Sequence, residues 1–139
     1  MSRRIAGIFV NSDGGVPYAK AIVQGYKPIE TRSRDMLGKL HGQTVAVVQT
    51  RRGKHPVVVG YANLEKLGFV QSGPDWEALR EETLIPPGSR YDAHGKGKWC
   101  YLMRWPTEEQ DPYALPENTV YHGRSWCEFD LDDIEQKEA

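Results

Sequence analysis

Two strand-forming runs joined by a short basic loop constrain the fold more than any other feature of the sequence. Residues 44–50 read Thr-Val-Ala-Val-Val-Gln-Thr, and residues 57–62 read Val-Val-Val-Gly-Tyr-Ala. β-Branched residues favour extended backbone, and because apolar and polar residues do not alternate, both faces of each strand should be buried. The connection between them, Arg51–Pro56, is basic. The sequence therefore predicts a hairpin in the wall of a small barrel, with other elements packed outside it.

Weaker patterns add the remaining elements. Pro17 and Gly25 favour the start and end of a short helix, and Asp75 is expected to cap a second helix that runs to Leu84. The other expected segments are strands at 5–10, 27–32, 99–105 and 120–131, an irregular stretch at 36–42 and a surface loop at 86–98. The fold class is therefore mixed α+β, mainly β. We expect a small barrel of five to six sequentially antiparallel strands with two short helices over its ends, and a mixed α+β sandwich is the alternative.

The length of 139 residues fits a single domain over residues 1–139, with residues 131–139 as a loose acidic tail. No run of about 18 apolar residues occurs, so no membrane span is expected, and the apolar stretch near the N-terminus is too short for a signal peptide. The two cysteines lack CxxC spacing and the four histidines lack ligand spacing. The sequence therefore predicts no metal site, no cofactor and a reducing, cytoplasmic location.

The net charge of −1 conceals an asymmetry along the chain. Residues 1–56 hold ten Lys or Arg against three Asp or Glu, whereas residues 57–139 hold eight against sixteen. A basic half suits a phosphate-bearing partner, although scattered solvated charge explains it equally well. The weakly acidic total excludes a protein that coats nucleic acid through bulk charge, so any such contact must be local.

The segment Gly25-Tyr26-Lys27-Pro28-Ile29-Glu30-Thr31-Arg32-Ser33 carries the most chemistry. In an extended chain Glu30 and Arg32 lie on one face, roughly 7 Å apart, while Thr31 faces the other way. The direction of Lys27 is open, because it precedes a proline at the entry to the strand. Three charges of both signs in six residues form either a functional site or a surface ion-pair set, and the residues alone favour neither.

This segment, together with Pro17-Tyr18-Ala19 before it, resembles the signature of the ASCH domain. In that family a short helix that begins near a proline leads into a G-x-K-x-x-E-x-R motif. The similarity continues through residues 42–47 and through 59–62, where a glycine is usual, and it covers roughly residues 5–64 well. From residue 65 onward the sequence is compatible with the family but does not resemble it as clearly. The resemblance implies a PUA-like β-barrel.

The resemblance also implies a cleft between the barrel and its helices, lined by Lys27, Glu30 and Arg32, that binds RNA or nucleosides. Arg32 offers a planar fork for a phosphate, a carbonyl or a base edge. Lys27 is a candidate base or anion ligand, and Glu30 a candidate acceptor for an exocyclic amine or an acid/base group. One family branch hydrolyses N4-acylated cytidine with a threonine nucleophile, where this chain has Glu30. That departure argues against acyl transfer through a threonine.

Further candidates surround this motif. Tyr18 and Ser33 are hydroxyl donors near it in sequence, and Lys20 lies on the polar face of the first helix. Arg51 and Arg52 form a phosphate grip or a solvated hairpin tip with equal plausibility. The late aromatic residues form either a stacking platform for bases or part of the core, and in a β-barrel the core is about twice as frequent. The two that are candidates for the site are Trp99 and Tyr101.

We therefore expect recognition of RNA or of a modified nucleoside or nucleotide in a cleft lined by Lys, Glu and Arg. The first alternative is a hydrolase that uses the same cleft, either a ribonuclease or a nucleoside amidohydrolase with Lys27 and Glu30 as catalytic candidates. The second is a protein-interaction module whose acidic half docks a basic partner. The sequence fixes neither the base nor the oligomeric state.

Overall fold

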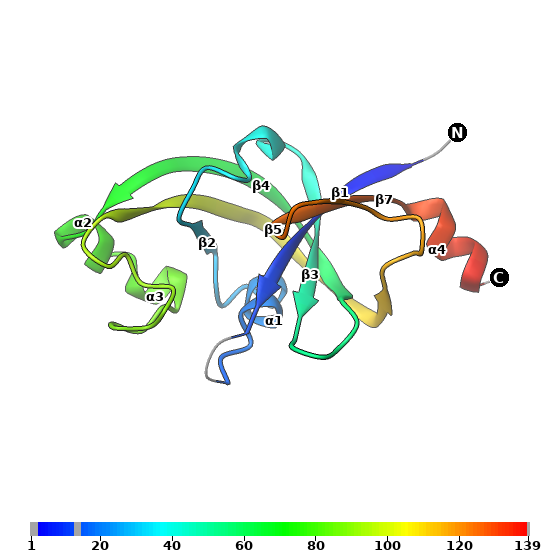
Figure 1. The fold of residues 1–139 in the computed structure, drawn as a ribbon, viewed down its shortest axis with the longest axis horizontal. Coiled ribbons are helices and arrows are strands. Elements are labelled where there is room, and N and C mark those ends of the chain that lie inside the picture. Colours follow the sequence, from blue (N-terminus) through cyan, green and yellow to red (C-terminus); the bar gives the residue numbers. More distant parts are fainter. Residues whose placement is uncertain (1–2, 13–14, 139) are drawn as a thin grey trace.

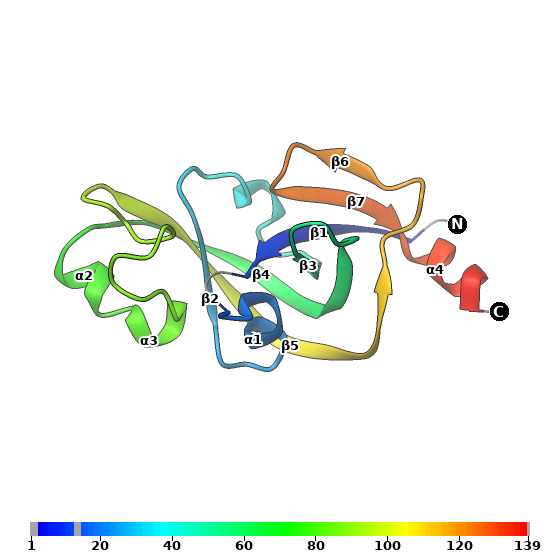
Figure 2. The same cartoon turned by 60° about the horizontal axis from the view of Figure 1, so that its bottom comes forward.

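The computed structural model describes residues 3–12 and 15–138, and side chains up to residue 134. Seven strands form one mixed sheet in the order β2-β5-β4-β3-β1-β7-β6 (Figures 1 and 2). The strands are β1 (Arg4–Asn11), β2 (Ile29–Arg32), β3 (Thr44–Thr50), β4 (Val57–Gln71), β5 (Gly97–Ala114), β6 (Val120–His122) and β7 (Trp126–Asp130). The helical elements are α1 (Tyr18–Val23), the 3₁₀ turn η1 (Gly38–Leu40), α2 (Pro74–Glu77), α3 (Arg80–Thr83) and α4 (Leu131–Glu138).

The expected hairpin exists, but it is only the base of a larger ribbon. β3 and β4 pair antiparallel from Gln49↔Val57 to Thr44↔Asn63. β4 then continues to Gln71 and pairs along its whole length with β5. This long β4–β5 ribbon extends away from the body of the molecule and ends beside α2 and α3, while α4 lies at the opposite end (Figures 1 and 2). The fold class is mainly β, as expected, with seven strands instead of five or six.

Helix α1 lies against the sheet because a glycine makes room for it. Its buried residues are Tyr18, Ala19, Ala21, Ile22 and Val23. A Cβ at Gly60 of β4 would lie 2.1 Å from the carbonyl oxygen of Thr107 and 2.6 Å from Cγ1 of Val23. Any larger residue at this position would force α1 off the sheet or β5 away from β4. The helix that carries Tyr18 is therefore positioned by Gly60.

Three expectations about the elements are wrong. β1 pairs with β3 in parallel, because α1 and β2 form a crossover between them, so the strands are not all antiparallel in sequence order. The expected strand at 120–131 is a hairpin of β6 and β7 with a turn between them. The expected helix from Asp75 to Leu84 is two short helices, and Gly73 with Pro74 at the first turn replaces Asp75 as the start. The acidic tail, outside these three expectations, is described as helix α4 up to Glu138.

The sheet separates two layers of core. One face packs against α1 and buries side chains that include Ile8, Val47, Leu64 and Tyr101. The opposite face packs against α4 and buries Phe129, Val48 and Ile134, among others. Since both faces of β1 and β3 are covered, their continuous apolar runs are explained. Within the described chain no helix is long and apolar enough to cross a membrane.

The sheet curves without closing. Among the described residues β2 pairs only with β5, and β6 only with β7, so each is an edge. The Arg32 side chain nevertheless reaches from β2 to β1 and donates from Nη2 to the carbonyl oxygen of Phe9 at 2.6 Å. We refer to this junction between β2 and β1, bridged by a side chain instead of a strand pair, as the seam. It is the place where the barrel expected from sequence stays open.

Candidate functional site

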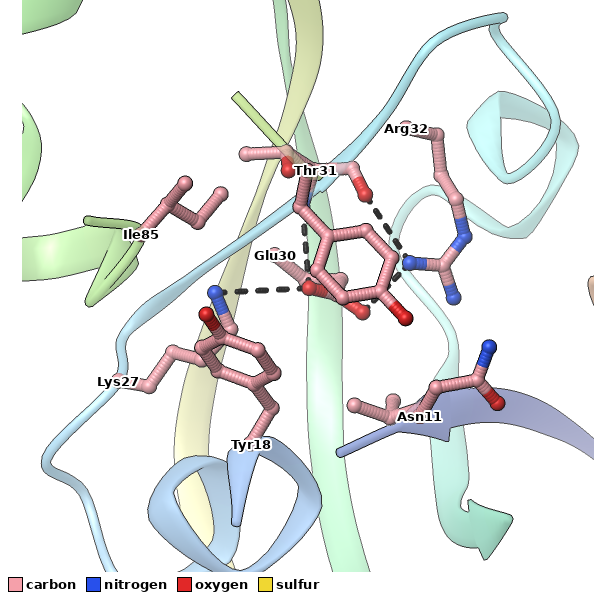
Figure 3. Close-up of a pocket in the computed structure, with 9 residues that line it drawn as sticks. Asn11, Tyr18, Lys27, Glu30, Thr31, Arg32 and Ile85 are labelled. Atoms are coloured by element: carbon pink, nitrogen blue, oxygen red, sulfur yellow. Dashed lines mark hydrogen bonds and ion pairs between the residues drawn. The ribbon is translucent and has the colours of Figure 1, made fainter. Parts of the chain in front are cut away.

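A small pocket of about 30 Å³ lies at the seam. It is bounded by β1, β2, the start of α1 and the loop after α3 (Figure 3). Its lining residues are Val10, Asn11, Tyr18, Lys27, Glu30, Thr31, Arg32, Ile85 and Tyr91. Four of the residues singled out from the sequence, those of the charged motif and Tyr18, are thus brought together.

Glu30 is the centre of the charged group. Its side chain is 7 % exposed, and Oε2 accepts from Nη1 of Arg32 at 2.5 Å while Oε1 accepts from the backbone N–H of Thr31 at 3.1 Å. Nζ of Lys27 lies 3.5 Å from Oε1 (Figure 3). A carboxylate has about four lone-pair positions, so Glu30 keeps room for one further donor from the pocket.

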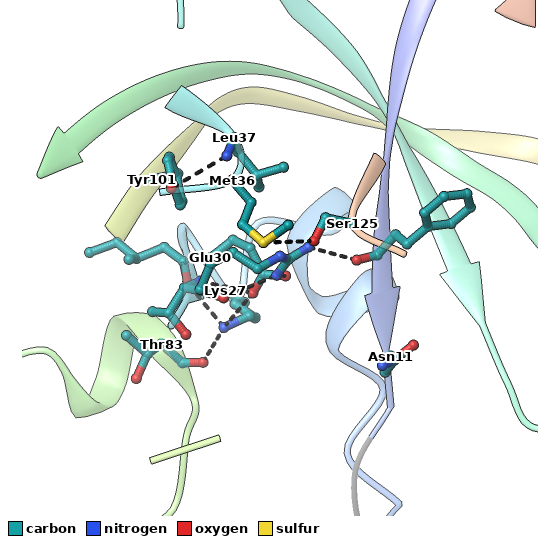
Figure 4. Close-up of polar contacts among 12 residues, drawn as sticks. Asn11, Lys27, Glu30, Met36, Leu37, Thr83, Tyr101 and Ser125 are labelled. Carbon is teal, nitrogen blue, oxygen red and sulfur yellow. Dashed lines mark hydrogen bonds and ion pairs between the residues drawn. The ribbon is translucent and has the colours of Figure 1, made fainter. Parts of the chain in front are cut away.

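Lys27 anchors the floor of the site. Its ammonium donates to the carbonyl oxygens of Ile29 at 2.9 Å and Thr83 at 2.5 Å (Figure 4). With Glu30 as the third neighbour, its three N–H groups are all engaged. The Tyr18 ring lies 5.0 Å from Nζ, and the side chain is 1 % exposed. The direction that the sequence left open is therefore inward, where Lys27 ties β2 to the end of α3.

The charges of the motif stabilise one another in a buried setting. Burial lowers the pKa of Lys27, and the neighbouring Glu30 carboxylate offsets only part of that effect. Burial alone would raise the pKa of Glu30, but Arg32 and then Lys27 outweigh it, so the pKa of this carboxyl lies below its usual range. Glu30 is therefore ionised at neutral pH and acts as an acceptor only.

Arg32 holds the seam and still has hydrogen-bonding capacity. Nη1 donates to Oε2 of Glu30 and, at 3.0 Å, to the carbonyl oxygen of Thr31, while Nη2 donates to Phe9. A guanidinium has five N–H groups, so one on Nη2 and the one on Nε have no acceptor among the described residues. The side chain is 17 % exposed, in contrast to the closed-in Lys27. Of the three charged residues, Arg32 is the one most accessible to a ligand.

Alternation along β2 explains this arrangement. Glu30 and Arg32 share one side of the strand, as expected, and Ile29 packs on the other side with Trp76 and Cys100. β5 supplies the partner strand, in the register Glu30↔Tyr101 and Arg32↔Trp99. The motif thus occupies an edge strand, whose free side faces the seam.

Other residues singled out from the sequence lie outside the pocket. Tyr101 is fully buried in the main core and donates its hydroxyl to Asp35 at 2.8 Å, so it is not a stacking platform. Trp99 packs edge-on against Phe69 and under Nζ of Lys66. The hydroxyl of Ser33, just past β2, accepts from Lys98 at 3.4 Å. Lys20 lines a separate hollow against β5.

Arg51 and Arg52 lie in a second, open hollow of about 590 Å³ beside the pocket. Its lining residues are Asn11, Ser12, Thr50, Arg51, Arg52 and Arg90. We call this hollow the basic groove. Asn11 lines both the pocket and the basic groove, and Tyr91 and Arg90 are sequence neighbours that line one each. The two depressions are therefore adjacent.

Several lining residues were missed in the sequence analysis. Asn11 ends β1 before an expected turn and had no motif around it. Tyr91 belongs to the segment expected to be a surface loop and Ile85 directly precedes it, but Ile85 is 3 % exposed and the Tyr91 ring meets Tyr18 edge-on at 5.9 Å. The apolar residues within that polar segment were the available signal. Ser125, outside the pocket lining, accepts at its carbonyl from the N–H of Phe9, and its hydroxyl contacts Met36 beside the seam (Figure 4).

Within the described residues no group of three or more His, Cys, Asp or Glu side chains is arranged to hold a metal ion. No family model matches the sequence, and no curated protein matches it.

Solved structures do resemble it. The crystal structure of ASCH from Zymomonas mobilis superposes with a TM-score of 0.65 at 21% identity, covering 95% of this chain and 93% of that one. Two variants of the same protein, one with serine replaced by alanine and one with tyrosine replaced by phenylalanine, give TM-scores of 0.62 at 22% identity, each with 95% of this chain covered. The motif in residues 25–33 predicted this likeness, and the chain has the fold of these ASCH structures.

Proposed function

We propose that this chain recognises RNA or a modified nucleoside by holding the polar edge of a base at the Lys27–Glu30–Arg32 pocket. The observation that carries the proposal is that an unused hydrogen-bond acceptor and unused donors lie side by side at the seam. Glu30 offers an acceptor site and Arg32 offers two N–H donors, and both side chains line the same pocket. Donor and acceptor side by side complement a base edge that presents an amine next to a ring nitrogen or carbonyl, such as that of cytosine or adenine.

The size of the pocket limits what enters it. A volume of about 30 Å³ is close to the space of one water molecule. An exocyclic amine or oxygen therefore fits inside, and the rest of the base lies across the mouth, against Tyr91 and Asn11. The buried and mutually paired charges need no rearrangement before a ligand arrives, which favours affinity through preorganisation. The ASCH-like fold adds independent support.

A hydrolase that acts on RNA or N4-acylated cytidine is the second candidate, favoured by one observation. Burial lowers the pKa of Lys27, and a lysine with a lowered pKa in a pocket is a typical general base. The three acceptors around its ammonium favour a structural cation instead. Recognition without turnover is the function that this hydrogen bonding supports better.

The test is a binding and turnover assay on purified protein. Fluorescently labelled RNA and a panel of nucleosides, including N4-acetylcytidine, are titrated while amide shifts are recorded by NMR and products by mass spectrometry. We expect saturable binding that shifts the amides of Asn11, Arg32 and Tyr91. Arg32→Gln should abolish binding, whereas Arg104→Gln, which removes an equal charge from an exposed pair with Glu65, should not.

Each other outcome is informative. Ligand-induced shifts confined to residues away from the seam, in folded wild-type protein, would refute the assignment even if Arg32→Gln is unstable. Product that is lost in Lys27→Met or Glu30→Gln would make the hydrolase the correct candidate. No binding by any RNA or nucleoside would leave the pocket without its proposed ligand.

A further inference from the structure

We infer that the basic groove is a phosphate-binding subsite, so the ligand of the neighbouring pocket is a phosphorylated nucleotide or RNA and not a free nucleoside. The orientation of that ligand rests on the proposed function of the pocket, whereas phosphate binding in the groove does not. The chemistry is that of a phosphate mono- or diester, which either a mononucleotide or an RNA strand supplies.

Three guanidinium groups gather in this groove, those of Arg51, Arg52 and Arg90. None of the described lining residues is acidic. Arg51 and Arg52 are exposed, and neither forms an ion pair or a side-chain hydrogen bond with a described residue. Like charges held close together repel one another, and an anion removes that repulsion. Guanidinium forks match phosphate oxygens in geometry as well as in charge.

Asn11 supplies a donor where the groove meets the pocket. It pairs in register with Thr50 across β1 and β3, and the Thr50 hydroxyl donates to Oδ1 of Asn11. This bond fixes the side-chain amide so that Nδ2 keeps its two N–H groups for another acceptor, and the described residues provide none. A neutral donor at the junction of two hollows is well placed for a sugar hydroxyl or a phosphate oxygen.

A second link joins the two depressions on their opposite side. Arg90 donates to the Tyr91 hydroxyl at 2.5 Å, and its guanidinium lies 4.8 Å from the centre of the Tyr91 ring. Tyr91 lines the pocket and Arg90 lines the groove. A ligand whose base lies at the seam therefore meets cationic groups on the side where Asn11 and Tyr91 border the groove, and phosphate is the part of a nucleotide that such groups hold.

The experiment compares ligands that differ only in phosphate. Uniformly labelled full-length protein is titrated with pyrophosphate, with the four common nucleosides, with their 5′-monophosphates and with a short 5′-phosphorylated RNA, at two salt concentrations. Pyrophosphate alone should shift the amides of Arg51 and Arg52. Each monophosphate should bind at least about tenfold more tightly than its nucleoside, and this advantage should shrink as salt rises. A larger gain for the RNA than for the monophosphates would identify the phosphodiester strand as the source.

Three variants locate the effect. The double variant Arg51→Gln/Arg52→Gln should remove both the pyrophosphate shifts and the advantage of the monophosphates, while nucleoside affinity stays unchanged. Asn11→Asp keeps the acceptor for Thr50 but replaces the donor by a negative charge, and it should weaken monophosphates more than nucleosides. Lys54→Gln removes a charge from the same loop outside the groove lining and is the matched control.

The two proposals fail separately. Pyrophosphate binding that depends on the two arginines, without any nucleoside binding, would uphold the phosphate subsite and refute the role of the pocket. Nucleoside binding at the seam with no gain in affinity from phosphate would uphold the role of the pocket and refute the phosphate subsite. Phosphate binding that survives the double variant, or that Lys54→Gln weakens equally, would overturn the subsite.

Discussion

The pocket and the basic groove share Asn11, yet they hold their charges in opposite ways. In the pocket, Lys27 and Glu30 are buried, paired and of opposite sign. In the groove, Arg51 and Arg52 are exposed, unpaired among the described residues and of one sign. In the proposed function, the geometry of the first arrangement would set which chemical edge fits, and the positive field of the second would attract phosphate. Selectivity and attraction would then depend on different residues.

The largest effect is expected where a buried charge loses its partner. Glu30→Ala would leave Lys27 and Arg32 facing each other with little solvent, so the free energy of unfolding should fall by about 3–5 kcal/mol. The control is Glu65→Ala, which removes an exposed pair with Arg104 and should cost less than about 1 kcal/mol. Urea denaturation of both variants measures the difference. Equal losses of unfolding free energy in the two variants would show that the buried Glu30 stabilises the protein no more than the exposed pair does.

The next largest effect is a loss of nucleotide affinity, and it distinguishes the geometry of the Arg32 side chain from its charge. Arg32→Lys keeps the positive charge but cannot bond Glu30 and Phe9 together, so the affinity for a nucleotide should fall by about tenfold or more, or about 1.4 kcal/mol. Arg52→Lys should reduce this affinity less, because the lysine keeps the charge while Arg51 and Arg90 keep their guanidinium forks in the groove. Titrations of one monophosphate at one salt concentration suffice. A matched loss in both variants would remove the distinction between the two sites.

A smaller effect should follow a change in pH. The pKa of Glu30 is lowered on folding from an ordinary value of 4.5, so its stabilising contribution is complete above that value and is lost as pH falls through the folded-state pKa. Stability measured by urea denaturation should therefore decline between pH 5 and pH 3. Glu30→Gln, which cannot titrate, should show a shallower decline. Parallel curves for the two proteins would contradict the assignment of this acid dependence to Glu30.

The smallest effect is expected in the groove. Arg52→Gln touches no buried contact, and it should change the free energy of unfolding by no more than about 0.5 kcal/mol. Any change should be a gain that disappears in high salt, because the variant relieves repulsion with Arg51. Thermal unfolding at low and high salt checks this. A clear loss of stability would mean that Arg52 supports the fold.

The local features of the chain were predictable because they depend on residues close in sequence. The β3–β4 hairpin, the first helix between Pro17 and Gly25, and the shared face of Glu30 and Arg32 all follow from short-range patterns. The long β4–β5 ribbon was not predictable, because its outer half is exposed and bulged, so its sequence lacks a regular apolar alternation. The parallel pairing of β1 with β3 joins residues that lie 39 positions apart in sequence, such as Ala6 and Val45, and no local pattern encodes it.

The candidate site divides in the same way. The charged members of the pocket come from one segment and were identified from the sequence. Asn11, Ile85 and Tyr91 come from β1 and from the loop after α3, and only the folded chain brings them to β2. The aromatic strand left two interpretations open because parity alone does not distinguish a surface platform from the core, and Tyr101 lies in the core. Gly60 shows the converse. The family resemblance indicated that a glycine is usual at this position, but only the structure gives the reason, which is close packing against α1 and β5.

The seam has a consequence for how the protein accepts ligands of different size. A wall closed by strand pairing widens only by breaking several backbone hydrogen bonds together, whereas between the described residues of β2 and β1 this wall is joined by the hydrogen bond from Arg32 to Phe9. Arg32 therefore holds the seam and, in the proposed function, also contacts the ligand, so the two roles would share its N–H groups. If the pocket holds a base as proposed, a bulky modification on that base would enter at the expense of this hydrogen bond, and the strength of the bond would set how large a modification the protein tolerates.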